Sequence, residues 1–217
     1  MNIFFLSRNR KECAKYYQNL HMKIILEIAQ MLCSSYYLSL VPEDGSTDRL
    51  EEYTKSCPKL YRPTHKGHPM VHWVARTPEN FQYAASLGLD LCAVYTGRRG
   101  RTHACEEIIQ WCHDHPPPPV DLSDTGTTVY GQTDNPDGCT PVPLCMPPQY
   151  RGTSTVDSYR AVYVGEKLEF LGSRRRVAAW TPDEIPPFVE ESKEWKKLQK
   201  AEVKAKEESK GKRSRAD

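Results

Sequence analysis

Three groups of residues in this chain carry side chains suited to chemistry, and the first centres on one glutamate. Glu27 lies between the apolar residues Leu26 and Ile28, in a segment with helical periodicity. A partly buried carboxylate on a helix can give or take a proton, so Glu27 is a candidate general acid or base. The alternative is an exposed ion pair with Lys23, four residues earlier, on an ordinary solvated helix face.

The second group is the stretch of residues 61–73, YRPTHKGHPMVHW. Four of its side chains are candidates for contacts with phosphates and bases: His65, Lys66, His68 and Trp73. His68 and His72 also have the spacing of two zinc ligands on a helix. However, Pro69 follows the first of them, and the glutamate of the H-E-x-x-H pattern is absent. We therefore expect no metal site, and no nucleotide-binding motif indicates another cofactor.

The third group surrounds the turn between Gly97 and Gly100 and has four members: Arg98, Arg99, Arg101 and His103. Arginines on such a turn can bind successive phosphates through their fork-shaped donors, while the glycines permit close approach of the backbone. The alternative is a solvated helix C-terminus, where the helix dipole favours arginine in any case.

The elements that must position these groups are mostly helices. Apolar periodicity without Pro or Gly predicts a long helix over residues 11–40, and Thr77 before Pro78 predicts the start of another that Gly97 would end. A third helix would run from about His103 to the prolines at 116–119, and a fourth from the cap Ser154 towards Gly172. The short apolar run at residues 3–6 fits a strand or a buried terminus.

Composition divides the chain into two parts. We expect one mostly α-helical domain over residues 1–190, with a long proline-rich loop at 116–150 that contains nine of the 17 prolines. The tail, residues 191–217, holds most of the excess of positive charge, since residues 193–217 contain ten basic and five acidic side chains. It lacks a continuous apolar stripe and is expected to be disordered or a frayed helix, serving as a nuclear address, a phosphate binder or solvated charge.

Several classes of protein are disfavoured by the same composition. No apolar run approaches the roughly 20 residues that span a bilayer, and the charges of MNIFFLSRNRK follow its apolar stretch, the wrong order for a secretory signal. Five cysteines lie among apolar neighbours in the expected helices, which favours reduced thiols: Cys13, Cys33, Cys92, Cys105 and Cys112. We expect a soluble, intracellular monomer without a membrane partner.

Four segments carry a resemblance to uncharacterised proteins of phages and large DNA viruses: MNIFFL, HMKIILEIAQMLCSS at 21–35, YRPTHKGHPMVHW at 61–73 and LCAVYTGRRGRTH at 91–103. For a viral protein, the host cytoplasm or nucleus is the expected location. More distantly, the order of a short N-terminal strand, a helix with a His and a Glu, a G-H-P-x-x-x-W motif, a helix and R-x-G-x-x-H resembles the pyrimidine-dimer DNA glycosylase family, typified by phage endonuclease V.

That second resemblance implies a small helical enzyme that binds damaged double-stranded DNA and cuts a glycosidic bond. It implies that an N-terminal amine, here that of Asn2 after removal of Met1, forms a Schiff base with the sugar. Glu27 would stabilise the cationic intermediate and support the lyase step, with His21 near the same helix start. Lys23 would join the residues of the second and third groups in binding DNA.

Two hypotheses follow from these residues. The first is a DNA glycosylase/AP lyase that uses the N-terminal amine and Glu27. Because Asn2 is bulky and would hinder removal of Met1, a chain that keeps Met1 would either use the amine of Met1 itself or have no amine nucleophile. The second is a non-catalytic viral protein that uses the same scaffold to bind DNA or a host partner.

Overall fold

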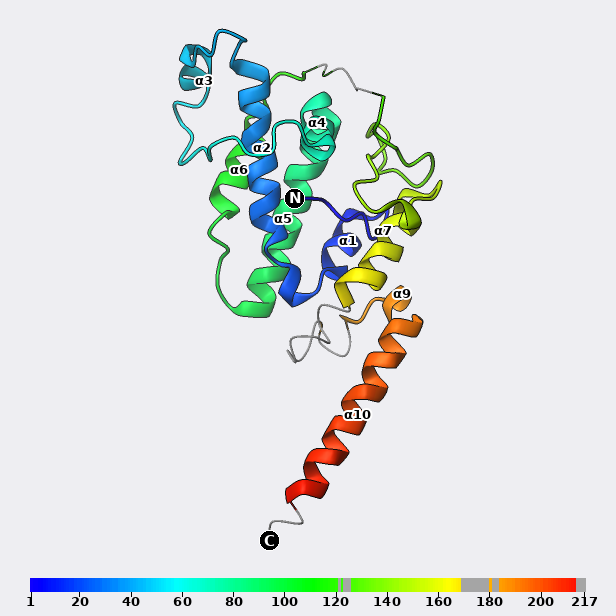
Figure 1. Cartoon of the computed structure of the whole chain (residues 1–217). Coiled ribbons are helices and arrows are strands. Elements are labelled where there is room, and N and C mark those ends of the chain that lie inside the picture. The colour runs from blue at the N-terminus through cyan, green and yellow to red at the C-terminus, as the bar shows by residue number, and fades with distance from the viewer. Residues whose placement is uncertain (121, 123–125, 169–179, 181–183, 214–217) are drawn as a thin grey trace.

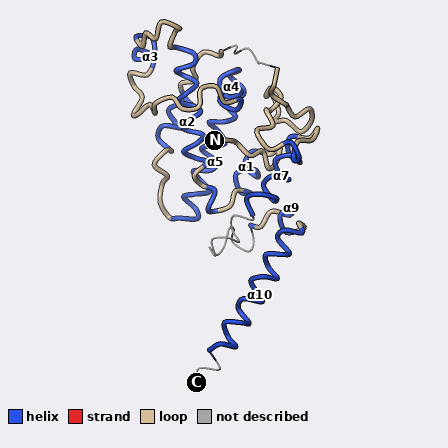
Figure 2. The backbone as a smooth tube through the Cα atoms, in the orientation of Figure 1, coloured by secondary structure: helices blue, strands red, loops and turns tan. Residues whose placement is uncertain are grey.

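The computed structural model describes residues 1–120, 122, 126–168, 180 and 184–213, and in these the chain is built from α-helices (Figures 1 and 2). The described residues form no strand; two isolated bridges join Tyr130 to Pro143 and Thr133 to Ser154. The predicted all-α fold is therefore confirmed.

The centre of the fold is helix α2 (Ile24–Leu40), which packs against α4 (Pro69–Arg76), α5 (Pro78–Arg99) and α6 (Glu106–Asp114). Its apolar side contributes side chains that are completely buried: Ile24, Ile25, Ile28, Met31 and Leu32. The five cysteines expected in the interior are buried and unpaired: Cys13, Cys33, Cys92, Cys105 and Cys112. Hydrophobic burial over this stripe is the main stabilising contribution to the packing.

The predicted continuous helix over residues 11–40 is wrong, because the chain turns between α1 (Arg10–Tyr16), η1 (Asn19–His21) and α2. Tertiary hydrogen bonds hold the break: the Tyr17 hydroxyl accepts the Phe4 N–H at 2.7 Å and donates to the Phe4 carbonyl at 2.8 Å. The Gln18 N–H donates to the Tyr163 hydroxyl at 2.9 Å. The break lets α1 fold back against α5.

Helix α5 begins as its sequence predicts but ends one turn later. The Thr77 hydroxyl accepts the Asn80 N–H at 3.2 Å and so caps the first turn. The end lies at Gly100 rather than Gly97, because Gly100 has a φ of 66°, a left-handed conformation that glycine adopts without steric cost. Residues 98 and 99 therefore belong to the helix itself.

Three α-helices were not predicted: α3 (Asp48–Tyr53), α4 and the four-residue α9 (Pro187–Glu190). Helix α4 begins after His68, whose Nδ1 accepts the Met70 N–H at 3.1 Å. Helix α6 ends before the four prolines, as expected, and α7 (Thr155–Val162) is capped by Ser154, which accepts the Asp157 N–H at 3.1 Å. A π-helical turn, η3 (Tyr163–Lys167), continues α7. The rest of the segment predicted to reach Gly172 lies outside the described residues.

The proline-rich loop forms one wall of the core. Three of its side chains are buried: Val142, Leu144 and Met146. Thr140 fastens the loop to the α4–α5 junction, because its carbonyl accepts the Trp73 indole N–H at 3.0 Å and its N–H donates to Asn80 Oδ1 at 3.0 Å. A short helical turn, η2 (Pro148–Tyr150), leads from the loop towards α7.

The two ends of the chain have different structures. Residues 3–6 belong to no helix or strand and are at most 5% exposed, so the apolar run is a buried terminus rather than a strand. The charged tail follows α9 (Pro187–Glu190) as helix α10 (Lys193–Arg213), which Figure 1 shows extending away from the other helices. Within the described residues, no helix is both long and apolar enough to cross a membrane.

Candidate active site

The N-terminal segment runs between α2 and α7, as Figure 1 shows, and brings the first backbone nitrogens to Glu27. The Asn2 N–H donates to Glu27 Oε2 at 3.0 Å, and the Met1 amine lies 3.7 Å from the same oxygen. The Asn2 side chain is held on both sides: Nδ2 donates to the Cys145 carbonyl at 2.9 Å, and the Tyr159 hydroxyl lies 3.2 Å from Oδ1. Residue 2 is thus fixed beside the carboxylate.

Glu27 combines features of both interpretations of its sequence. Its Oε1 lies 3.4 Å from Lys23 Nζ, so the expected ion pair four residues apart is present. The Lys23 side chain is 70% exposed, but that of Glu27 is only 19% exposed and its other oxygen faces the start of the chain. The carboxylate is therefore in a cleft, not on an ordinary solvated face.

A cavity of about 240 Å³ opens at this point. Four of the residues predicted from sequence line it together: Asn2, His21, Lys23 and Glu27. They come from the N-terminal segment, η1 and the first turn of α2, so the break between α1 and α2 is what brings His21 to the cavity. The proline-rich loop adds apolar and backbone groups on one side.

Two further charged residues that line the cavity were not predicted. Glu166 and Lys167 line the cavity from η3, about 140 positions away from Glu27 in sequence. Lys167 Nζ lies 5.5 Å from the centre of the Phe4 ring, a cation–π contact, and the Lys167 carbonyl accepts a bond from Gln18 Nε2 at 3.4 Å. π-Helical turns are frequent at functional sites, but a run of residues does not reveal one in advance.

His21 is buried at 6% exposure among aromatic rings, with the centre of the Phe4 ring 4.9 Å away. Burial, together with the positive charges of Lys167 and Lys23, lowers the pKa of His21 to about 3. The imidazole is therefore neutral at physiological pH, and its Nδ1 has no hydrogen-bond partner in the described structure. His21 can serve the cavity as a neutral hydrogen-bonding group, but not as a cationic acid.

A pH-dependent loss of stability follows from this buried imidazole. Between the usual pKa of 6.5 and the lowered value of about 3, the unfolded chain binds a proton at His21 that the folded chain does not. Stability should therefore fall as pH drops below about 6.5, by about 2 kcal/mol between pH 7 and pH 5. Urea unfolding at the two pH values measures this loss. His21→Phe, which keeps an aromatic ring, should lose about 2 kcal/mol less over that interval; equal losses would contradict the assignment.

Of the histidines of the second group, His68 interacts electrostatically with the site, and it has a structural role as well. His68 caps α4, and its pKa is lowered, first by burial and then by the positive charge of the Met1 amine, with Glu27 acting in the opposite direction. His68 is therefore within electrostatic range of the site. His65 and Lys66 are exposed, and the Lys66 carbonyl accepts a hydrogen bond from His72 Nε2 at 2.6 Å.

Burial corrects two of the predicted DNA contacts, those of Trp73 and Arg98. Trp73 is 1% exposed and its indole N–H is bonded within the protein, so it cannot stack on a base. The Arg98 side chain is 7% exposed, and its guanidinium is already satisfied. It donates to Glu184 at 3.1 Å and to two carbonyls of the α1 end, Tyr17 at 2.7 Å and Lys15 at 3.0 Å. Arg98 holds α1 in place and is not available to a phosphate.

The remaining members of the third group do not line the cavity. Arg99 is exposed, and Arg101 is exposed with Nε donating to the Tyr95 hydroxyl at 3.1 Å. His103 accepts the Cys105 N–H at 3.2 Å, and its ring packs edge-on against Tyr95. They form a separate surface at the end of α5, and any contact that they make with DNA is distinct from the cavity.

Two further findings concern the site: the first is about metal ions and the second about similarity to known proteins. In the part of the chain that the structure describes, no group of three or more His, Cys, Asp and Glu side chains is arranged to bind a metal ion. Comparison of the chain with known proteins finds no matching family model, no matching curated protein and no matching solved structure.

Proposed function

We propose that this protein is a DNA glycosylase/AP lyase whose nucleophile is the first amine of the chain and whose acid–base group is Glu27. The observation that supports the proposal is the distance between them. Whether the chain starts at Met1 or at Asn2, an α-amine lies within 3.0–3.7 Å of Glu27 Oε2. A nucleophile within reach of a general base is the arrangement that covalent catalysis requires.

The cavity suits the sugar of a damaged nucleotide. Its volume of about 240 Å³ is below the roughly 300–1,000 Å³ of pockets that enclose drug-sized molecules. A deoxyribose at an abasic or damaged position is a group of suitable size, provided that it is turned out of the duplex. Lys23 and Lys167 are placed to neutralise the phosphates that flank such a sugar.

The chemistry needs a proton acceptor at two steps. The amine attacks C1′, the bond from C1′ to the base breaks, and the proton lost by the amine passes through Glu27 to the departing base. The C1′–O4′ bond then opens as O4′ takes a proton from solvent water, and a C1′=N iminium remains, which the carboxylate stabilises by charge. Removal of a C2′ proton by Glu27 expels the 3′ phosphate and cuts the strand. His21 stays neutral throughout.

Trapping with borohydride tests the identity of the amine. Borohydride reduces the iminium to a stable amine, so a duplex with one abasic site should become covalently attached to the protein. We expect a Gly-Ser extension before Met1 to reduce the trapped fraction at least about tenfold, because each added residue moves the amine by up to about 3.3–3.6 Å. Intact mass first establishes which residue carries the amine, and gel electrophoresis then measures the adduct.

The matched control carries the same dipeptide at the C-terminus, where it leaves the first amine unchanged. Peptide mapping of the adduct should place the sugar on the first residue. An adduct on Lys23 or Lys167, trapped equally well by the extended protein, would overturn the role of the terminal amine. If no variant gives an adduct, the enzymatic proposal fails and a non-catalytic DNA-binding protein is left.

A further inference from the structure

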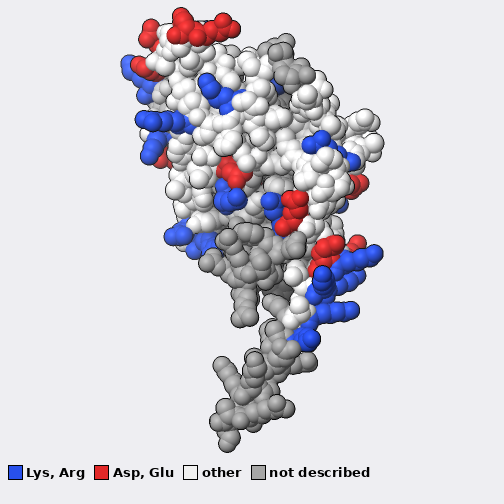
Figure 3. All heavy atoms as spheres, viewed as in Figure 1, with Lys and Arg blue, Asp and Glu red and all other residues white. Residues whose placement is uncertain are grey.

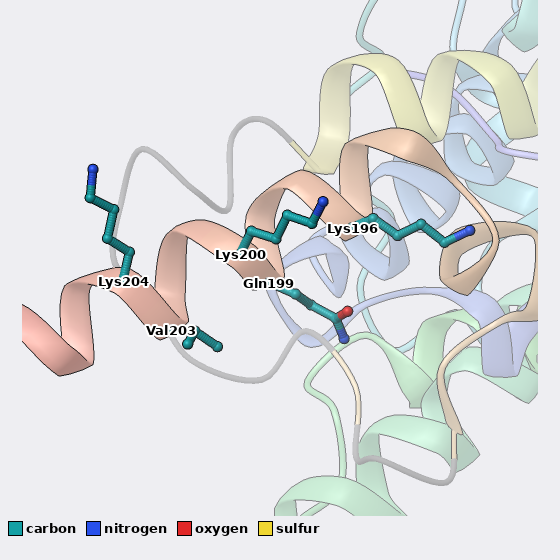
Figure 4. Close-up of a pocket in the computed structure, with 5 residues that line it drawn as sticks. All are labelled: Lys196, Gln199, Lys200, Val203 and Lys204. Carbon is teal, nitrogen blue, oxygen red and sulfur yellow. The ribbon is translucent and has the colours of Figure 1, made fainter.

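We infer that helix α10 carries a second binding surface, which takes the phosphate backbone of double-stranded DNA. The surface, here called the lysine stripe, consists of five exposed residues: Lys193, Lys196, Lys197, Lys200 and Lys204. At 100° per residue they fall within an arc of about 100°, so they share one face of the helix. Figure 4 shows three of them, Lys196, Lys200 and Lys204, on successive turns beside Gln199 and Val203.

The orientation of the lysine stripe is fixed by the base of the helix. Trp195 and Leu198 lie on the other side of α10 and are partly buried against the core. The ring centres of Trp195 and Trp180 are 6.0 Å apart in an edge-to-face contact. Because the apolar side is anchored, the lysines must face away from the core. In Figure 3, basic side chains gather at the start of α10 with acidic ones beside them, and a further acidic group lies at the opposite end of the molecule, near α3.

Among the side chains that the structure describes, no acidic partner neutralises the charges of the lysine stripe. None of the ion pairs among the described side chains involves these five lysines; Lys196 instead donates to the Glu191 carbonyl at 3.1 Å. Lys196 and Lys200, and again Lys200 and Lys204, are four residues apart, a spacing at which like charges destabilise a helix. A polyanion would relieve this repulsion, so the face is electrostatically complementary to one.

The spacing of the lysines favours a nucleic acid backbone over a scattered acidic surface. Residues four apart are separated by about 6 Å along the helix axis, and the whole stripe is about 16 Å long. Each strand of duplex DNA carries a phosphate about every 3.4 Å of axis, a density at which several lysines of the stripe can contact phosphates at once. Lysine binds phosphates as a point charge and needs no base contact, which implies binding without sequence preference.

The position of the lysine stripe is compatible with the proposed activity. Helix α10 packs against η3, the turn whose Glu166 and Lys167 line the cavity. The inference deepens the proposed function, since it adds an anchor for the duplex beside the site. It does not depend on catalysis, because binding to undamaged DNA can be measured alone.

Fluorescence anisotropy with an undamaged duplex of about 20 base pairs tests the inference in the full-length protein. The triple variant Lys196→Gln, Lys200→Gln and Lys204→Gln should bind at least about tenfold more weakly at low salt. The slope of log K against log salt should become shallower by about 0.9 for each phosphate that the variant no longer neutralises. The control, Lys11→Gln, Lys55→Gln and Lys59→Gln, removes the same charge from exposed sites elsewhere.

A second variant separates charge from folding. Replacing Lys196, Lys200 and Lys204 with arginine keeps the charge and should keep the affinity, while circular dichroism should show equal helix content in all the variants. Equal affinity and slope for the glutamine triple and its control would overturn the inference. Failure of trapping by the terminal amine would leave it standing, because no covalent step enters this measurement.

Discussion

Replacing Glu27 with glutamine is expected to reduce strand cleavage at an abasic site by about 10²–10⁴-fold, the contribution of one positioned acid–base group. Glutamine has nearly the same shape, and its amide oxygen can still accept the Asn2 N–H that lies 3.0 Å from Glu27 Oε2. It cannot take up a proton, and it offers no negative charge to an iminium. The variant should therefore fold normally and lose the chemistry.

The measurement is the rate of single-turnover cleavage of an end-labelled duplex, with unfolding in urea as the test of the fold. Glu107→Gln is the matched control, because Glu107 is exposed on α6 and outside the cavity. Glu166→Gln changes the other carboxylate of the cavity. Full cleavage by Glu27→Gln, or loss of cleavage only in Glu166→Gln, would assign the acid–base role elsewhere.

The second large effect concerns stability. Trp73→Ala is expected to lower the free energy of unfolding by about 3–5 kcal/mol, a large part of the ~5–15 kcal/mol of a typical domain. The indole is 1% exposed and packs edge-on against Phe5, with ring centres 5.5 Å apart. Removal of the indole leaves a cavity in the core. It also removes the hydrogen bond from the indole N–H to the Thr140 carbonyl, which holds the proline-rich loop against α4.

Urea unfolding monitored by circular dichroism measures this loss. Trp73→Phe keeps the ring contacts and gives up the bond to Thr140, so it should cost about 1–3 kcal/mol, chiefly for the unpaired carbonyl. It should also bind an undamaged duplex as the parent chain does. A Trp73→Phe protein that is stable but defective in DNA binding would restore Trp73 to the DNA-binding surface.

The helix starts capped by Thr77 and Ser154 and the proline stop after α6 were the most predictable features of this fold, because their signals are local. Thr77 and Ser154 each accept an N–H within the first turn that follows, and four prolines end α6. The break after Tyr16 had no such signal, since the hydroxyl of Tyr17 bonds to Phe4 and the Gln18 N–H bonds to Tyr163. Those partners are distant in sequence, and periodicity alone continues across the gap.

In the candidate site, too, some residues could be predicted from local sequence, whereas others depend on contacts that form only on folding. Glu27 was chosen as a candidate because a partly buried carboxylate on a helix can exchange a proton, and the N-terminal amine was proposed through a resemblance. Arg98 was misassigned because a glycine-flanked arginine resembles a phosphate contact, whereas its guanidinium bonds to carbonyls of the α1 end and to Glu184. Glu166 and Lys167 come from a π-helical turn that is distant in sequence from α2 and lines the same cavity only in the folded chain.

The burial of the chain's first residues determines when, during biosynthesis, Met1 can be removed. The Met1 side chain is 3% exposed, and among the hydrogen-bond partners of Asn2 the last to be synthesised is Tyr159. At about 5–20 residues per second, roughly 10–30 s separate synthesis of the two. An aminopeptidase therefore reaches Met1 most easily in that interval, on the nascent chain. Slow translation should favour a chain that begins at Asn2, and fast translation one that keeps Met1.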